Sequence, residues 1–141
     1  MAILGTLHTD PMKFLRAVLR ANAAFSILSG TAMIVGGAAL GASLGKPASV
    51  APDGVVLLVF AAVILWITRA ETVNLKAAGV IVALDVVYVV DTARQILAAQ
   101  FSTAGIWFYG IATLVVLDFA FLQLGGLLKA ARAGNVDEAL G

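Results

Sequence analysis

The chain has 141 residues, of which 62% are hydrophobic and only 12% are charged, whereas a soluble domain is roughly 25% charged. Its mean hydropathy of +1.04 exceeds what a water-soluble fold of this length can bury, so the composition indicates an integral membrane protein. The net charge of +1 gives no indication of nucleic-acid binding, and the lack of cysteine excludes disulfides, thiolate metal sites and a cysteine nucleophile. The one histidine, His8, excludes a haem or zinc site built on several histidines of a single chain.

The first apolar stretch predicts a membrane helix over residues 17–44, preceded by a cytoplasmic N-terminal segment, residues 1–13. A membrane-spanning helix needs about 20 predominantly apolar residues, so this stretch exceeds the minimum. Asp10 followed by Pro11 predicts a capped helix start with proline at the first helical position. The apolar run is also longer than the roughly 7–15 residues of a secretory signal core, so we expect it to be retained.

Three further apolar stretches predict membrane helices over residues 50–68, 76–97 and 104–128. With the first helix they form a predicted four-helix transmembrane domain, residues 14–128, followed by a polar cytoplasmic tail, residues 129–141. The expected fold class is therefore all-α, an integral membrane bundle in which helices adjacent in the sequence are antiparallel.

The basic residues are distributed unequally between the two sides of this bundle. Lys46 and Arg94 fall on one side, and the other seven of the nine fall on the side of both termini. These seven are Lys13, Arg16, Arg20, Arg69, Lys76, Lys129 and Arg132. Because cytoplasmic loops carry the excess of basic residues, the predicted orientation is N-in and C-in. Trp107 and Tyr109 are then expected at the outer membrane interface, and Trp66 at the inner one.

A repeat of small residues predicts close helix packing. Gly37, Gly41 and Gly45 recur every four residues, a spacing that places them along one helix face and lets another backbone approach closely. The packing partner is either another helix of the same chain or a second copy of the protein, and the sequence leaves both open.

Four charged residues fall inside the third and fourth predicted spans. Asp91 and Arg94 are three residues apart and close to the outer end of their helix, so they predict an ion pair at the outer interface. Asp85 and Asp118 lie about 14–16 Å from the cytoplasmic ends of their helices, near the middle of a core that is about 30 Å thick. Since their helices are consecutive and antiparallel, we expect these two carboxylates to lie side by side.

Polar residues of the first span complete a predicted buried cluster. Asn22 and Ser26, with Ser29, follow one helix face, and Asn22 lies at a similar depth to Asp85. The predicted cluster consists of Asn22, Ser26, Asp85, Tyr88 and Asp118, with Arg20 and Gln123 as further candidates. Charged groups at membrane depth are costly and indicate function, but hydrogen bonds between helices are an equally physical role for them. A structural tie and a proton or cation site both remain open.

Motifs of catalysis are missing from the chain. It contains no phosphate-binding loop, no G-x-S-x-G and no H-E-x-x-H. Both mid-membrane aspartates follow leucine, in "ALD" and "VLD", and so lack the flanks of intramembrane aspartyl proteases. We therefore expect no enzymatic activity, no catalytic residue and no metal site.

Several short motifs together carry a resemblance: "LRANAAFSILSG", a Gly/Ala-rich helix end, "LWITR", "VIVALD" and "LDFAFLQ". Over residues 14–128 the chain resembles a broad group of uncharacterised small four-span bacterial integral membrane proteins. That group has no agreed activity, so the resemblance implies a bacterial inner membrane location and supplies no functional residues.

The expected function is that of a non-enzymatic subunit, accessory or partner-binding component in the lipid bilayer. The expected partners are a second copy of the chain or another membrane protein, with no role for nucleic acid. The alternative is a proton- or cation-coupled transporter or channel in which Asp85 and Asp118 titrate. Whether a lipid, quinone or pigment occupies a groove between the helices stays open.

Overall fold

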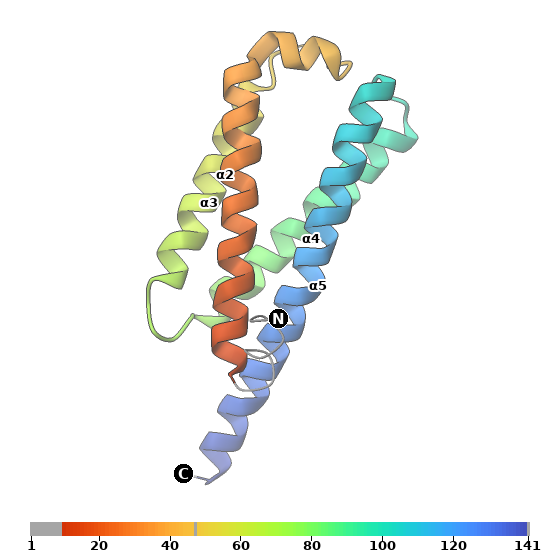
Figure 1. The fold of residues 1–141 in the computed structure, drawn as a ribbon. Coiled ribbons are helices and arrows are strands. Elements are labelled where there is room, and N and C mark those ends of the chain that lie inside the picture. The colour runs from red at the N-terminus through yellow and green to blue at the C-terminus, as the bar shows by residue number, and fades with distance from the viewer. Residues whose placement is uncertain (1–9, 47, 141) are drawn as a thin grey trace.

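The computed structural model describes residues 10–46 and 48–140, with the side chains of these residues up to Gly134. Over these residues the secondary structure consists of four helices: α2 (Pro11–Ser43), α3 (Ala51–Thr68), α4 (Leu75–Leu97) and α5 (Thr103–Leu140). The predicted all-α class is confirmed (Figure 1). His8 and most of the predicted N-terminal segment, residues 1–13, lie outside the described residues.

Three of the helices are long and apolar enough to cross a membrane: α2, α3, and α5 over Thr103–Gly134. The fourth, α4, has a similar length but carries Lys76, Asp85, Asp91 and Arg94. Many large apolar side chains are exposed on the outer faces of the helices, among them Leu28, Val35, Val90 and Leu97. These surfaces are those expected of a protein surrounded by lipid, which solvates apolar side chains.

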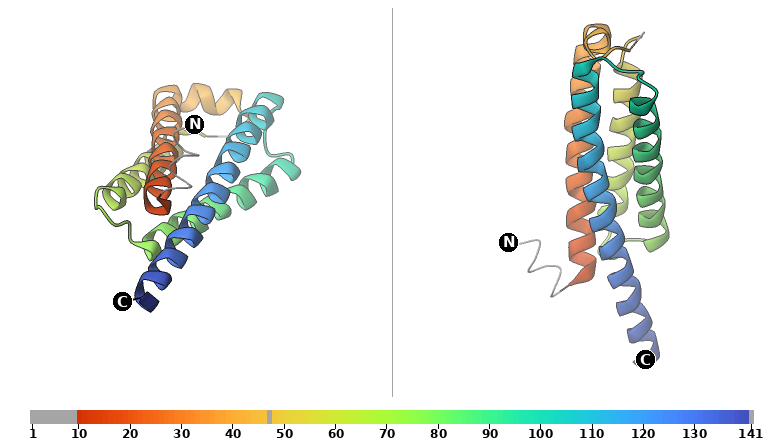
Figure 2. Two further views of the ribbon diagram at one scale, coloured as in Figure 1. Left: turned by 60° about the horizontal axis from the view of Figure 1, so that its bottom comes forward. Right: turned by 90° about the vertical axis from the view of Figure 1, so that its right-hand side faces the viewer.

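The helices form two antiparallel pairs that meet along α2 and α5. α2 packs along α3, α4 packs along α5, and α2 also packs against α5, whereas α3 and α4 barely touch each other. The views in Figure 2 show the two pairs and the separation of α3 from α4. The bundle is therefore open along its α3–α4 side.

Helices α2 and α4 each begin with a residue whose side chain caps the helix. The Asp10 carboxylate accepts hydrogen bonds from the backbone N–H groups of Met12 (3.0 Å) and Lys13 (3.2 Å), and Pro11 occupies the first turn, which confirms the predicted cap. The Asn74 side chain caps α4 in the same way, accepting from Lys76 and Ala77. These caps satisfy N–H groups that have no partner within the helix.

The expected continuous helix over residues 17–44 is interrupted at Gly37. Its backbone angles, φ 48° and ψ −126°, are non-helical and lie where residues with a Cβ are strained. The chain turns there, and residues 38–43 run across the end of the bundle (Figure 1, top). We call this the kinked end. The freed Gly37 carbonyl accepts from the N–H of Val50 at 3.3 Å, so the kink is tied to the start of α3.

The opposite end of the bundle, where α2 begins, is stabilised by hydrogen bonds from arginines. Arg16 donates to the carbonyls of Ala70 and Glu71, and Arg20 donates to the carbonyl of Thr68 at 3.0 Å. Here α5 does not end at residue 128 as expected but continues as a helix to Leu140. Lys129, Ala130, Ala131 and Arg132 are strong helix formers, which explains the continuation.

The close crossing of α2 and α3 depends on two glycines, Gly30 and Gly54. A Cβ added to Gly54 would lie 2.5 Å from the carbonyl oxygen of Gly30, and a Cβ on Gly30 would lie 2.7 Å from that of Gly54. Since both obstacles are backbone atoms, neither can move aside without separating the helices.

We therefore expect Gly54→Ala to lower the free energy of unfolding by about 1–3 kcal/mol, the usual cost of overpacking. Gly110→Ala is the matched control, because no other group lies within 4 Å of its added Cβ. Alanine is favoured over glycine in a helix by about 1 kcal/mol, so the control is expected to be neutral or stabilising. Thermal unfolding in detergent measures both, and equal midpoints for the two variants would contradict the close crossing.

Candidate functional site

Three buried polar side chains from three helices meet in the middle of the bundle. Asn22 on α2, Asp85 on α4 and Gln123 on α5 are 1%, 3% and 0% exposed. The Asn22 amide donates to Asp85 Oδ2 (2.9 Å) and to Gln123 Oε1 (2.8 Å), and the Gln123 amide donates to Asp85 Oδ2 (2.7 Å). We call these residues the polar triad. It closes a ring of hydrogen bonds that joins α2, α4 and α5.

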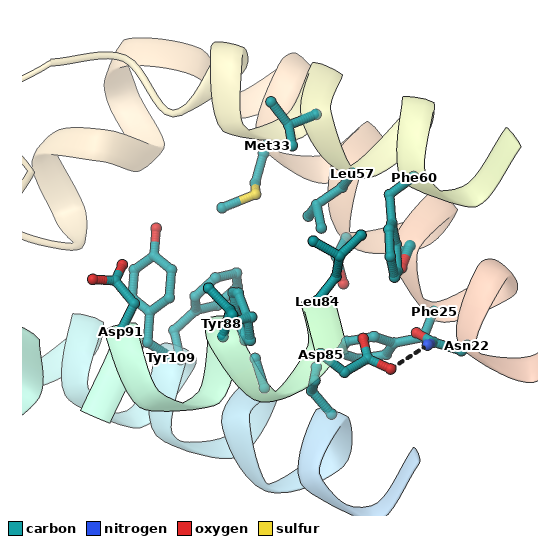
Figure 3. A pocket seen from close by; sticks show the side chains of 17 residues that line it. Asn22, Phe25, Met33, Leu57, Phe60, Leu84, Asp85, Tyr88, Asp91 and Tyr109 are labelled. Atoms are coloured by element: carbon teal, nitrogen blue, oxygen red, sulfur yellow. Dashed lines mark hydrogen bonds between the residues drawn. The ribbon is translucent and has the colours of Figure 1, made fainter. Parts of the chain in front are cut away.

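The two oxygens of Asp85 have different environments. Oδ2 accepts both amide hydrogen bonds, while Oδ1 accepts none from the described residues. In Figure 3 the oxygen that is not bonded to Asn22 points into the pocket. Among the described side chains, no basic group pairs with Asp85, because Arg20 binds Thr68 and Arg94 binds Asp91. Oδ2 of the Asp85 carboxylate is thus fixed by two hydrogen bonds, whereas Oδ1 has no hydrogen-bond donor among the described residues.

The pocket that Asp85 faces lies where α3 and α4 separate, and we call it the central cavity. Its volume is about 330 Å³, within the size range of small-molecule sites. Its walls are mostly apolar or aromatic: Phe25, Met33, Val56, Leu57, Phe60, Leu84, Val87, Phe108, Ala112 and Val116. The polar residues of the wall are Asn22, Ser26, Ser29, Asp85, Tyr88, Asp91 and Tyr109. An apolar space with a few convergent polar groups is the usual form of a ligand site.

A second, more polar space of about 220 Å³ adjoins the central cavity at the kinked end, and we call it the end hollow. Tyr88, Asp91 and Tyr109 line both spaces. In the end hollow the ammonium of Lys46 lies 3.8 Å from Asp53 and about 5.4 Å from the centre of the Tyr109 ring. The lining of these two adjoining spaces therefore becomes more polar from the central cavity towards the kinked end.

Tyr109, which the sequence analysis expects at the outer interface, is buried within the bundle beside the kinked end. It is only 5% exposed and stacks on Phe101 with ring centroids 4.5 Å apart. Its hydroxyl is buried without a hydrogen-bond partner, a state shared among the described side chains only by Arg16 Nε. Trp66 and Trp107, by contrast, are exposed near helix ends. A buried tyrosine hydroxyl without a partner is costly, so its position on the cavity wall indicates a missing hydrogen-bonding group.

Asp118 is not part of the polar triad, and the expected contact between Asp85 and Asp118 has to be corrected. Asp118 is exposed on α5 and forms no hydrogen bond or ion pair with the part of the chain that the structure describes. The reason is helical phase. At about 100° per residue, Asp118 is rotated by about 200° from Val116, whereas Gln123 returns to the same face as Val116. Gln123 therefore takes the place that the sequence analysis gave to Asp118.

Ser26 and Tyr88 line the central cavity together with Asn22 and Asp85 of the polar triad. Ser26 is buried, and Tyr88 is half-buried on α4, one turn from Asp85. Arg20, the other further candidate, does not reach the triad, because its guanidinium binds Thr68. The predicted cluster thus consists in the structure of Asn22, Asp85 and Gln123, with Ser26 and Tyr88 beside them.

The remaining predicted residues lie at the kinked end. Arg94 donates to Asp91 at 3.0 Å, and both side chains are exposed. Gly41 and Gly45 lie against backbone of the same chain, at Ala48 and at Phe101–Ser102, while Gly37 forms the kink. The small-residue repeat is therefore packed against other parts of the same chain.

The polar groups on the wall of the central cavity are suited to binding a molecule. Among the described residues, no three His, Asp or Glu side chains lie close enough together to hold a metal ion. A carboxylate oxygen, two serine hydroxyls and two tyrosine hydroxyls face an apolar space, and no general base is paired with a nucleophile in the hydrogen bonds around it. This arrangement can hold an apolar molecule and orient it by a few polar contacts.

Comparisons of the chain with protein-family models, with curated proteins and with solved structures find no significant match. The polar triad and the central cavity are therefore the features of the protein that bear on its function.

Proposed function

We propose that this protein is a non-enzymatic, four-span membrane protein that binds a membrane-embedded ligand between α3 and α4. The observation that carries this proposal is the central cavity of about 330 Å³, which lies on the open side of the bundle. Its apolar wall suits a molecule that partitions into lipid, and its polar groups can orient that molecule. Because the opening faces the surrounding membrane in this proposal, a ligand reaches it laterally from the bilayer.

The proposal includes α4 as the fourth span, and three observations support it. α4 has 23 residues, about 34 Å of helix, which is enough to cross a bilayer. Its central charge, Asp85, is sequestered by two amides, and Asp91 pairs with Arg94 close to the helix end. Charges that face the bundle interior or lie near the interface are those that membrane helices tolerate.

The proposed orientation places both termini in the cytoplasm of a bacterium, with the kinked end outside. α2 starts and α5 ends at the same end of the bundle (Figure 1). Seven of the nine basic residues belong to that end by their helix positions, and Lys46 and Arg94 belong to the kinked end. The excess of basic residues near the termini supports this sidedness.

The test is native mass spectrometry of the full chain, released gently from membranes in detergent. We expect a bound small molecule on the wild type and none on Ala112→Phe, which fills the cavity from α5. Ala83→Phe is the matched control, since Ala83 is exposed on α4 outside the cavity wall, and it is expected to keep the adduct. A wild type without an adduct, or an adduct that Ala112→Phe retains, would contradict the proposal.

Proton- or cation-coupled transport is the second candidate, and the open oxygen of Asp85 favours it. A titratable group at mid-depth that faces a cavity is a feature of membrane transport sites. The candidates differ in one observable. Transport requires solute flux across a vesicle membrane that depends on Asp85, whereas ligand binding requires no flux.

A further inference from the structure

The charged groups of the central cavity all have the same sign. Asp85 and Asp91 line it, and its wall contains no lysine, arginine or histidine. The two carboxylates differ in their partners, because Asp91 accepts from both Arg94 (3.0 Å) and Gln95 (2.7 Å). Asp85 has only neutral amides on one oxygen and an open second oxygen. The cavity therefore holds one buried acidic group whose charge is not offset by the protein.

Aromatic rings surround the space in front of this carboxylate. Phe25, Phe60 and Phe108 contribute to the wall with Tyr88 and Tyr109 (Figure 3, where all but Phe108 are labelled). The faces of aromatic rings attract cations, and the attraction is stronger where water is excluded. The Tyr109 hydroxyl adds an unpartnered polar atom on the same wall. Acidic, aromatic and apolar groups together are complementary to a cation with an apolar body.

We propose that the central cavity binds an organic cation with an apolar body, such as a protonated primary amine, whose charged head donates to Asp85 Oδ1. The body of the ligand lies against the aromatic and aliphatic wall of the cavity. Lys46 does not compete for Asp85, because its ammonium belongs to the end hollow and lies 3.8 Å from Asp53. This inference rests on the proposed ligand-binding function and specifies the chemical class of the ligand.

The test compares three probes that share a body and differ only in the head group: 4-phenylbutylammonium, 4-phenylbutanol and 4-phenylbutyrate. Equilibrium binding of the labelled ammonium probe to the full chain in phosphatidylcholine nanodiscs gives its dissociation constant, with empty nanodiscs subtracted, and the unlabelled alcohol and acid compete. We expect the ammonium to bind at least about tenfold more tightly than the alcohol, the ratio expected for one charge-assisted hydrogen bond. The carboxylate probe is expected not to compete.

Asp85→Asn is the decisive variant, because its side-chain oxygen can replace Oδ2 and keep both amide hydrogen bonds of the triad. It is expected to weaken binding of the ammonium about tenfold and to leave binding of the alcohol unchanged. Asp118→Asn removes the same charge from an exposed site outside the cavity wall, and it is expected to bind like the wild type. Ala112→Phe fills the cavity without altering the triad and is expected to bind neither probe, which tests the site even if Asp85→Asn fails to fold.

Two results would overturn the inference in distinguishable ways. Equal binding of the ammonium and alcohol probes, unchanged in Asp85→Asn, would mean that the cavity binds a neutral apolar ligand. The proposed ligand-binding function would then stand, and the proposal that the ligand is a cation would be wrong. If none of the probes binds and the wild type carries no adduct in native mass spectrometry, both the proposed function and the proposed ligand class would be wrong.

Discussion

Replacing Asn22 by leucine is expected to lower the free energy of unfolding by about 1–3 kcal/mol. Asn22 donates to both other members of the polar triad, so leucine leaves Gln123 Oε1 without a donor and removes one of the two donors to Asp85. Leucine has the same branching and the same number of side-chain heavy atoms as asparagine, so the hydrogen bonds are lost with little change of shape. Equilibrium unfolding in mixed detergent micelles measures it.

Thr113→Val is the matched control for this substitution. It also removes a polar group from a helix without changing the shape of the side chain. Among the described residues, however, the Thr113 hydroxyl donates only to the carbonyl of Tyr109 on its own helix. We expect a change below about 0.5 kcal/mol. The double variant Asn22→Leu/Gln123→Leu should lose less than the sum of the single variants, because both residues belong to one network. If Asn22→Leu is as stable as Thr113→Val, the triad does not hold the helices together.

Replacing Asp118 by leucine is expected to make membrane insertion of α5 more favourable by about 2.5–3.5 kcal/mol, the cost of a charge at mid-helix on insertion scales. The side chain is exposed on the outer face of α5, where lipid surrounds it in the proposed membrane arrangement. Glycosylation mapping of the full chain measures the insertion of this helix. The unfolding free energy of the folded bundle should change by less than about 0.5 kcal/mol, because no described contact is lost.

A second outcome for Asp118 would change the interpretation of that surface. If Asp118→Leu destabilises the folded protein and dissociates an oligomer in cross-linking, the carboxylate contacts a second copy of the chain, as the expected self-association requires. Phe121→Leu is the control for that measurement, because it alters the exposed face of α5 without a charge. The two outcomes distinguish a lipid-facing aspartate from one that lies in an interface.

The composition of the site was only partly predictable from the sequence. Asn22, Ser26, Asp85 and Tyr88 were identified by their depth and by their positions on helix faces, and they lie on the wall of the central cavity. Gln123 was only a secondary candidate, although it is fully buried in the triad. Its inward position is seen only in the structure, where Val116, Ala120 and Gln123, spaced i, i+4 and i+7, share one buried face of α5.

The position of Asp118 could not be predicted for a related reason. α5 carries large apolar side chains on its exposed as well as its buried side, and Ile111, Leu114 and Phe121 are among the exposed ones. Without a polar face, the sequence does not show which side of the helix points inward, since lipid and protein interior favour the same side chains. Depth along the helix could be estimated by counting residues, but rotation about its axis could not.

The sequence by itself determined the all-α class, the membrane-compatible length of the helices and the cap at Asp10, because these depend on residues close together in the chain. Only the tertiary structure decided that α3 and α4 separate, that Gly37 turns the chain, and that Asp85 is held on one side by Asn22 and Gln123. The physical reason is that these features result from the packing of helix faces far apart in the sequence. In an apolar chain that packing is set by close fit and a few hydrogen bonds, and local hydrophobicity does not encode it.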